Sequence, residues 1–177
     1  MDLGSEANDR PLEIGVFYHQ GIVEHLGWYS NPRVLADAMD NISCRSALTL
    51  LKDGLEQAVM RDRERPVQAI YMIGDCNEEP LYRVEEAAYS VSRLGVPVYA
   101  FYDDCTKDKD GEIAYRRTAE ITGGLFAPFG ATASLGDLVK ATLAYQTDGL
   151  EALRRLNNGA AKHLLANNQR LLAFIQG

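Results

Sequence analysis

The chain has 177 residues, of which 46% are hydrophobic and 24% are charged, and its formal net charge is -7. A chain of this length forms one domain of ordinary size, with a core that needs no disulfide. The composition excludes a disordered protein, and no run of residues approaches the length of a membrane span. We expect no nucleic-acid partner, because the negative charge repels phosphate backbones.

The first predicted elements are a β-hairpin and a short helix. Residues 12–18 and 22–29 are rich in branched and aromatic side chains and are separated by a turn that contains a glycine. Asn31 and Pro32 then supply a helix N-cap and a first-turn proline, and apolar residues follow at helical spacing.

Strands and helices alternate after this hairpin. A helical pattern over 48–59 leads into an apolar strand at 67–73, and a second one over 84–94 leads into a strand at 96–102. The alternation continues more faintly with the helix 112–122, the strand 125–127 and a helix that Ser134 opens. This order predicts a three-layer α/β/α domain around an open, mostly parallel, Rossmann-like sheet.

The last part of the chain has no further strand signal. Its apolar residues recur at helical spacing, which predicts a helical extension over residues 150–177 that packs back on the domain of residues 1–149. The alternative is a helix that docks on a partner.

The cysteines and the first residues bear on the compartment. The stretch 1–6 has neither the basic nor the apolar part of an export signal, so we expect a cytoplasmic protein. Cys44, Cys76 and Cys105 lie far apart, with no histidine at ligand spacing, which disfavours disulfides and a zinc site. Reduced thiols are expected.

Acidic residues mark one candidate site. Ligands of an open parallel sheet bind beyond the carboxyl ends of its strands. Asp75 directly follows the strand 67–73, and Asn77 and Glu78 come next, so oxygen atoms there could hold a hard cation or a basic group of a partner. The same carboxylates could instead cap the following helix. Two further loops are expected at this edge, namely 43–49 and 103–110.

Cys76 is the basis of an alternative prediction, in which the chain is a cysteine-dependent enzyme. It follows a buried strand and could lie at a helix N-terminus, where the helix dipole lowers the pKa of a thiol. A cysteine nucleophile also needs a base, but the spacing brings none of the three histidines (His19, His25 and His163) near it. A structural thiol is the more common case.

Several motifs follow one another in a fixed order along residues 12–145. After the hairpin and the helix come C-R-S-A-L-T, I-G-D-C-N-E-E, G-V-P-V-Y-A-F and A-E-I-T-G-G-L-F-A-P-F. This set resembles a von Willebrand factor A-type (VWA) domain of the bacterial intracellular kind. The resemblance implies a non-enzymatic module that binds a protein partner at the loops beyond its strands.

The resemblance also implies a metal site. In the family a divalent metal, usually magnesium, is held by a D-x-S-x-S motif on the first strand, a threonine from a second loop and an aspartate from a third. Thr49 matches the threonine and Asp75 matches the aspartate, but D-x-S-x-S does not occur here in a strand context. We therefore expect a degenerate site that binds magnesium weakly or not at all. The remaining residues expected to contact a partner are Ser46, Asn77, Glu78, Asp103 and Asp104.

In the family a strand and a helix precede the hairpin, whereas only a short segment does so here. The resemblance therefore implies an N-terminally truncated domain, in which residues 1–3 are the tail of the missing helix. Two alternatives are a sheet that closes without this strand and a structural subunit whose gap another chain fills.

Overall fold

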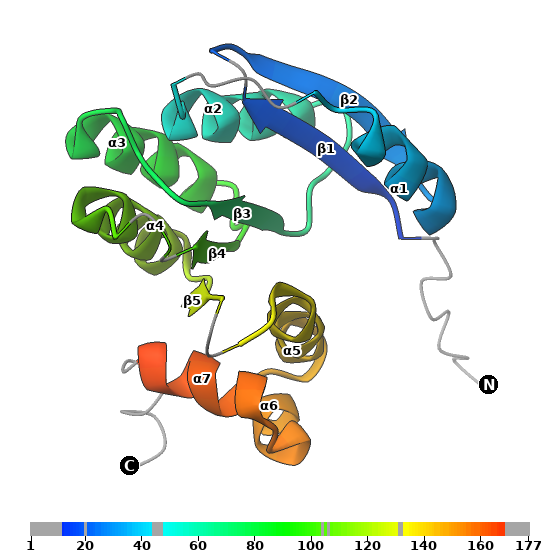
Figure 1. The fold of residues 1–177 in the computed structure, drawn as a ribbon, viewed down its shortest axis with the longest axis vertical. Coiled ribbons are helices and arrows are strands. Elements are labelled where there is room, and N and C mark those ends of the chain that lie inside the picture. The colour runs from blue at the N-terminus through cyan, green and yellow to red at the C-terminus, as the bar shows by residue number, and fades with distance from the viewer. Residues whose placement is uncertain are drawn as a thin grey trace, which may run out of the picture. The chain divides into compact units, whose positions relative to one another are not determined.

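A computed structural model describes most of the chain, which Figure 1 traces from end to end. The described residues are 12–19, 21–43, 48–103, 105, 107–130 and 133–168. They belong to two compact units, Met1–Leu48 and Thr49–Gly177.

The first unit contains an antiparallel hairpin and one helix. β1 (Ile14–His19) pairs with β2 (Val23–Tyr29), as predicted. α1 (Pro32–Asp40) also begins as predicted, because the Asn31 side chain accepts hydrogen bonds from two backbone N–H groups of its first turn. None of the described residues of this unit is fully buried.

The second unit is built on a parallel sheet in the order β3-β4-β5. β3 (Ile70–Gly74) and β4 (Val98–Asp103) are joined by α3 (Leu81–Ser92). α4 (Lys109–Thr122) then joins β4 to β5 (Phe126–Phe129). The predicted α/β fold with a parallel sheet is confirmed, and the layout is compatible with a Rossmann-like arrangement.

Some element bounds differ from the predicted ones for local reasons. β3 begins later than residue 67 because the Val67 N–H donates to the Asp62 carboxylate at 2.9 Å and closes a turn. β4 begins just after Pro97, whose nitrogen has no hydrogen to donate to a ladder. α4 begins earlier than predicted because Asp108 caps it, so the end of the acidic loop is already helical.

Helices cover both faces of this sheet (Figure 1). α2 (Leu51–Asp62) lies in the same layer as α3 and α4 and shares their hydrophobic core. The second core contains residues of α5 (Leu135–Asp148), α6 (Leu150–Leu156) and α7 (Gly159–Asn167). Side chains of β4 alternate between the two cores, which gives a three-layer α/β/α unit.

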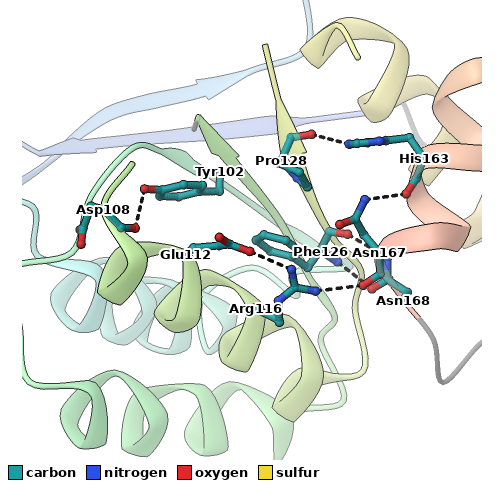
Figure 2. Close-up of polar contacts among 9 residues, drawn as sticks. All are labelled: Tyr102, Asp108, Glu112, Arg116, Phe126, Pro128, His163, Asn167 and Asn168. Carbon is teal, nitrogen blue, oxygen red and sulfur yellow. Dashed lines mark hydrogen bonds and ion pairs between the residues drawn. The ribbon is translucent and has the colours of Figure 1, made fainter. Parts of the chain in front are cut away.

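Side chains close the outer edge of β5, as Figure 2 shows. The Phe126 N–H donates to Asn168 Oδ1 at 3.0 Å, and the Phe126 carbonyl accepts from Asn168 Nδ2 at 2.8 Å. Pro128 has no N–H, and its carbonyl lies 2.8 Å from His163 Nε2. The Arg116 guanidinium covers the Phe126 ring at 4.1 Å from its centre. These side chains take the hydrogen-bonding positions that a neighbouring strand would otherwise occupy.

In the segment predicted as a helical extension, the described residues form α6 and α7, and α7 ends at Asn167. The apolar residues beyond 168 that contributed to that prediction lie outside the described residues. Along the described segments, every helix lacks either the length or the apolar character that crossing a bilayer requires.

Candidate functional site

The candidate site lies at the carboxyl edge of the sheet in the second unit. β3 and β4 are parallel and in register, with Gly74 opposite Tyr102. Asp75 therefore leaves the sheet at the same edge as Asp103, the last residue of β4. We call the following residues the rim: Thr49, Asp75, Cys76, Asn77, Glu78 and Asp103.

Cys76 joins the two residues that the resemblance assigns to a metal site. Thr49 Oγ1 lies 3.0 Å from Cys76 Sγ, and the Asp75 side chain hydrogen-bonds to the same thiol. Burial raises the pKa of this thiol above its ordinary value of 9.0. The bond from Thr49 opposes the rise in pKa, whereas Asp75 and the negative charge of Glu78 add to it. The thiol therefore stays protonated near neutral pH.

The two glutamates of the turn hold the start of α2. The Thr49 N–H donates to the Glu78 carboxylate, and the Lys52 N–H donates to Glu79 Oε2 at 2.7 Å. α2 needs these acceptors because Leu50, at its N-cap, has no side chain that could accept them. The sequence suggested that the acidic turn might cap the next helix, but α3 has no side-chain cap. Glu79 caps the preceding helix instead, and Glu78 accepts from the residue before its N-cap.

Asn77 connects the same turn to α4. Its backbone N–H donates to Asp108 Oδ2 at 3.3 Å, and its amide donates to the Glu79 carbonyl at 2.7 Å. Gly111 allows this close packing, because a Cβ there would lie 2.6 Å from Asp108 Oδ2 and 3.1 Å from Cys76 Cα. Sequence reasoning missed Asp108 and Gly111. The D-x-x-G spacing at a helix start is the signal that could have found them.

Two tyrosines support the rim from the core. Tyr115 is buried, and a Cβ on Gly74 would lie only 2.1 Å from its hydroxyl. Tyr102 packs edge-on against Tyr115, and its hydroxyl donates to the Asp108 carbonyl at 2.6 Å (Figure 2). Burial, with a smaller contribution from the charge of Asp75, raises the pKa of Tyr115, so its hydroxyl stays neutral. Neither tyrosine was predicted as a site residue.

The predicted site residues do not all meet. Thr49, Asp75 and Glu78 lie around Cys76. Asp103 lies at the same edge, but its carboxylate accepts from the N–H of Cys105 at 3.0 Å, within its own loop. The other predicted residues, Ser46 and Asp104, lie outside the described residues.

The donor atoms of the rim do not suit magnesium. Magnesium requires oxygen ligands in near-octahedral geometry, with carboxylates among them. Here the Thr49 hydroxyl is engaged by a thiol, a group that magnesium avoids, and Asp75 bonds to the same sulfur atom. Across the described part of the chain, no three His, Cys, Asp or Glu side chains are grouped so that they could hold a metal ion.

Comparisons of the chain with models of known families, with curated proteins and with solved structures give no match. The resemblance to the VWA class is therefore carried by the motifs of the sequence.

Proposed function

We propose that this chain is a protein-interaction module of the VWA class, with a degenerate metal-ion-dependent adhesion site at the rim. The contact between Thr49 and Cys76, beside Asp75, carries the proposal. Two residues that match ligand positions of the family come from separate segments and lie around one thiol. Because D-x-S-x-S does not occur in a strand context, the proposed site recognises protein without tight magnesium.

A cysteine-dependent enzyme has less support. The pKa of the Cys76 thiol is raised, whereas a cysteine nucleophile needs a lowered pKa. Cys76 also bonds to a hydroxyl and a carboxyl group rather than to an imidazole. Its contacts support a structural thiol that holds Thr49 beside Asp75.

Partner capture tests the interaction module. The tagged full chain is incubated in a cell lysate, and bound proteins are quantified by mass spectrometry. The double variant Asp75→Asn, Glu78→Gln removes two charges from the rim but keeps side chains that can accept the same hydrogen bonds. We expect this variant to lose a protein that the wild type binds.

The matched control is the double variant Glu86→Gln, Asp148→Asn, which makes the same chemical changes away from the rim. Both positions are exposed, on α3 and at the end of α5. We expect the control to bind the same protein as the wild type. Equal capture by the rim variant and the control would overturn the proposed binding surface.

Calorimetry tests the degenerate metal site. Because Thr49 is engaged by a thiol, we expect magnesium to bind the full chain no more tightly than the millimolar range, as an order of magnitude. The Asp75→Asn variant should give the same titration curve as the wild type. A micromolar magnesium site that disappears in Asp75→Asn would contradict the degenerate site.

A further inference from the structure

The two edge strands of the sheet in the second unit, β5 and β3, differ in the hydrogen-bond partners of their outward-facing backbone groups. Asn168 and His163 close the β5 edge, as described above. At the other edge, the Ile70 N–H donates to the Pro97 carbonyl, so in a parallel ladder the backbone groups of Ile70 and Met72 face β4. Those of Tyr71 and Ile73 point away from β4, and no strand among the described residues of this unit pairs with them.

β3 has none of the features that normally protect an edge strand. Its sequence, IYMIG, contains no proline and no charge, and it pairs with β4 without a bulge. Ile73 is 48% exposed, although Phe101, its neighbour across the ladder, is 0% exposed. The apolar surface of the sheet therefore continues to the edge of β3, where it meets no further strand among the described residues of this unit.

The helix layer extends beyond this edge. α3 packs between α2 and α4, and α4 lies over β4 and β5. Three neighbouring helices span about 20 Å between their outer axes, whereas three strands span about 10 Å. α2 therefore lies outside β3 by about two strand spacings. Leu51 and Leu55 on α2 belong to the core that also contains Met72 of β3, so the side of α2 facing the sheet is apolar.

This geometry disfavours a second copy of the chain as the occupant. A symmetric pair of β3 strands would place the α2 helices of both copies above the same junction. By the same spacings α3 lies over β3, so the two α3 helices would be only about 5 Å apart, closer than the 8–10 Å at which helices pack. The edge of β3 therefore suits a single added strand that has no helix on the face of the sheet covered by α2, α3 and α4.

The charges near the two ends of β3 have opposite signs, and they favour one direction for an added strand. At the carboxyl end of β3, Asp75 and Glu78 lie at the rim. At the opposite end, α2 runs into Arg63 and Arg65, and the bond from Val67 to α2 fixes this turn beside the approach to β3. A segment along β3 therefore meets an acidic end and a basic end.

We propose that an extended, apolar segment of a partner protein adds to the edge of β3 beneath α2, with a basic residue at the rim and an acidic residue at the other end. This inference rests on the proposed function in one respect, since it describes the partner of the interaction module. Backbone groups of Tyr71 and Ile73 give the segment its ladder, and its apolar side chains cover Ile73, whereas Leu51 and Leu55 of α2 are already buried.

A synthetic peptide tests this inference on the full chain. The probe is the labelled peptide Glu-Thr-Val-Ile-Val-Ile-Thr-Lys, which has an apolar centre and one charge of each sign. Its binding is followed by fluorescence anisotropy. Two control peptides carry either proline at the fourth position, which blocks the ladder, or glutamate at both ends. We expect the probe to bind and each control to bind about tenfold more weakly or worse.

Two variants of the chain locate the binding site. Ile73→Lys places a charge at the edge of β3, and Ile113→Lys makes the same change on α4 at 45% exposure, close to the 48% of Ile73. We expect Ile73→Lys to abolish binding of the probe and Ile113→Lys to leave it unchanged. Circular dichroism checks that both variants are folded, and the control peptides test the ladder without any change to the protein.

Amide hydrogen exchange identifies competing occupants. In the chain alone, the amides of Tyr71 and Ile73 should exchange faster than those of Ile70 and Met72, and the probe should slow them. Slow exchange in the monomeric chain would mean that this chain covers its own edge, and slow exchange that appears with dimer formation would mean a second copy. Either result overturns the inference. If the probe fails to bind but capture still depends on the rim, the inference fails and the proposed function remains.

Discussion

At Cys76 the surroundings, more than the residue type, determine the chemistry. A thiol directly after a buried strand could have been a nucleophile, and the sequence left that possibility open. The structure places it between a hydroxyl group and two acidic side chains and removes part of its surface from water. Burial and negative charge both favour the protonated form, so the thiol serves as a hydrogen-bonding group at the rim.

Alkylation of Cys76 by iodoacetamide should show an apparent pKa above 9.0, because the folded chain disfavours the thiolate. Thr49→Val should raise this pKa further, since it removes the bond that opposes the rise. Mass spectrometry of the modified peptide over a pH series measures both values. Unfolded chain provides the reference, and an apparent pKa below that reference would favour the cysteine enzyme.

The same pKa shift makes stability depend on pH. The folded chain holds the thiol proton more tightly than the unfolded chain does. The contribution of Cys76 to the free energy of unfolding is therefore fully present below pH 9.0 and is lost as the pH rises from 9.0 through the higher pKa of the folded chain.

Two glycines provide a test of local packing. A Cβ at Gly124 would lie 1.9 Å from the Val98 carbonyl oxygen, which belongs to the backbone of β4 and cannot move aside. Gly124→Ala should therefore lower the free energy of unfolding by about 3 kcal/mol. Gly136→Ala meets nothing within 4 Å on α5 and should raise it by about 0.5 kcal/mol. Urea denaturation measures both, and equal effects would contradict the packing described here.

At the scale of elements, some helix starts could be predicted from the sequence and one could not. Asn31 and Ser134 cap α1 and α5 from adjacent positions, and both were predicted from local spacing. The start of α2 is held by Glu78 and Glu79, which lie 29 and 27 residues from Thr49 and Lys52 and accept from their N–H groups. A cap contributed by a distant turn leaves no periodic or local signal, so the acidic turn was interpreted as a cap for the wrong helix.

The closure of the β5 edge by Asn168 can be tested by substitution. Asn168→Leu keeps a similar size but leaves the N–H and the carbonyl of Phe126 buried without partners. We expect the free energy of unfolding to fall by about 2–3 kcal/mol. Asn167→Leu is the matched control, because its side chain bonds only to the helix carbonyl of His163. Equal losses in urea denaturation would mean that the amide of Asn168 does not serve as a strand neighbour.

At the scale of the whole molecule, alternation of apolar strands with amphipathic helices was enough to predict the α/β fold, the parallel sheet and its two helical faces. These features follow from periods within single elements. The candidate site was predictable only in part. Thr49 and Asp75 were found through a resemblance, whereas Tyr115 and Gly111 act through contacts between elements far apart in the sequence. A gap beside β3 was expected only through the same resemblance, because edge position depends on the pairing of whole strands.

The hydrogen bonds between Phe126 and Asn168 cannot form until well after β5 has been synthesised. The two residues are 42 positions apart, so a ribosome that adds 5–20 residues per second needs about 2–8 s to reach Asn168 after it has made Phe126. β5 therefore leaves the ribosome ahead of the residue that seals it by the same interval. Neighbouring nascent chains on one messenger RNA can pair through it until Asn168 arrives.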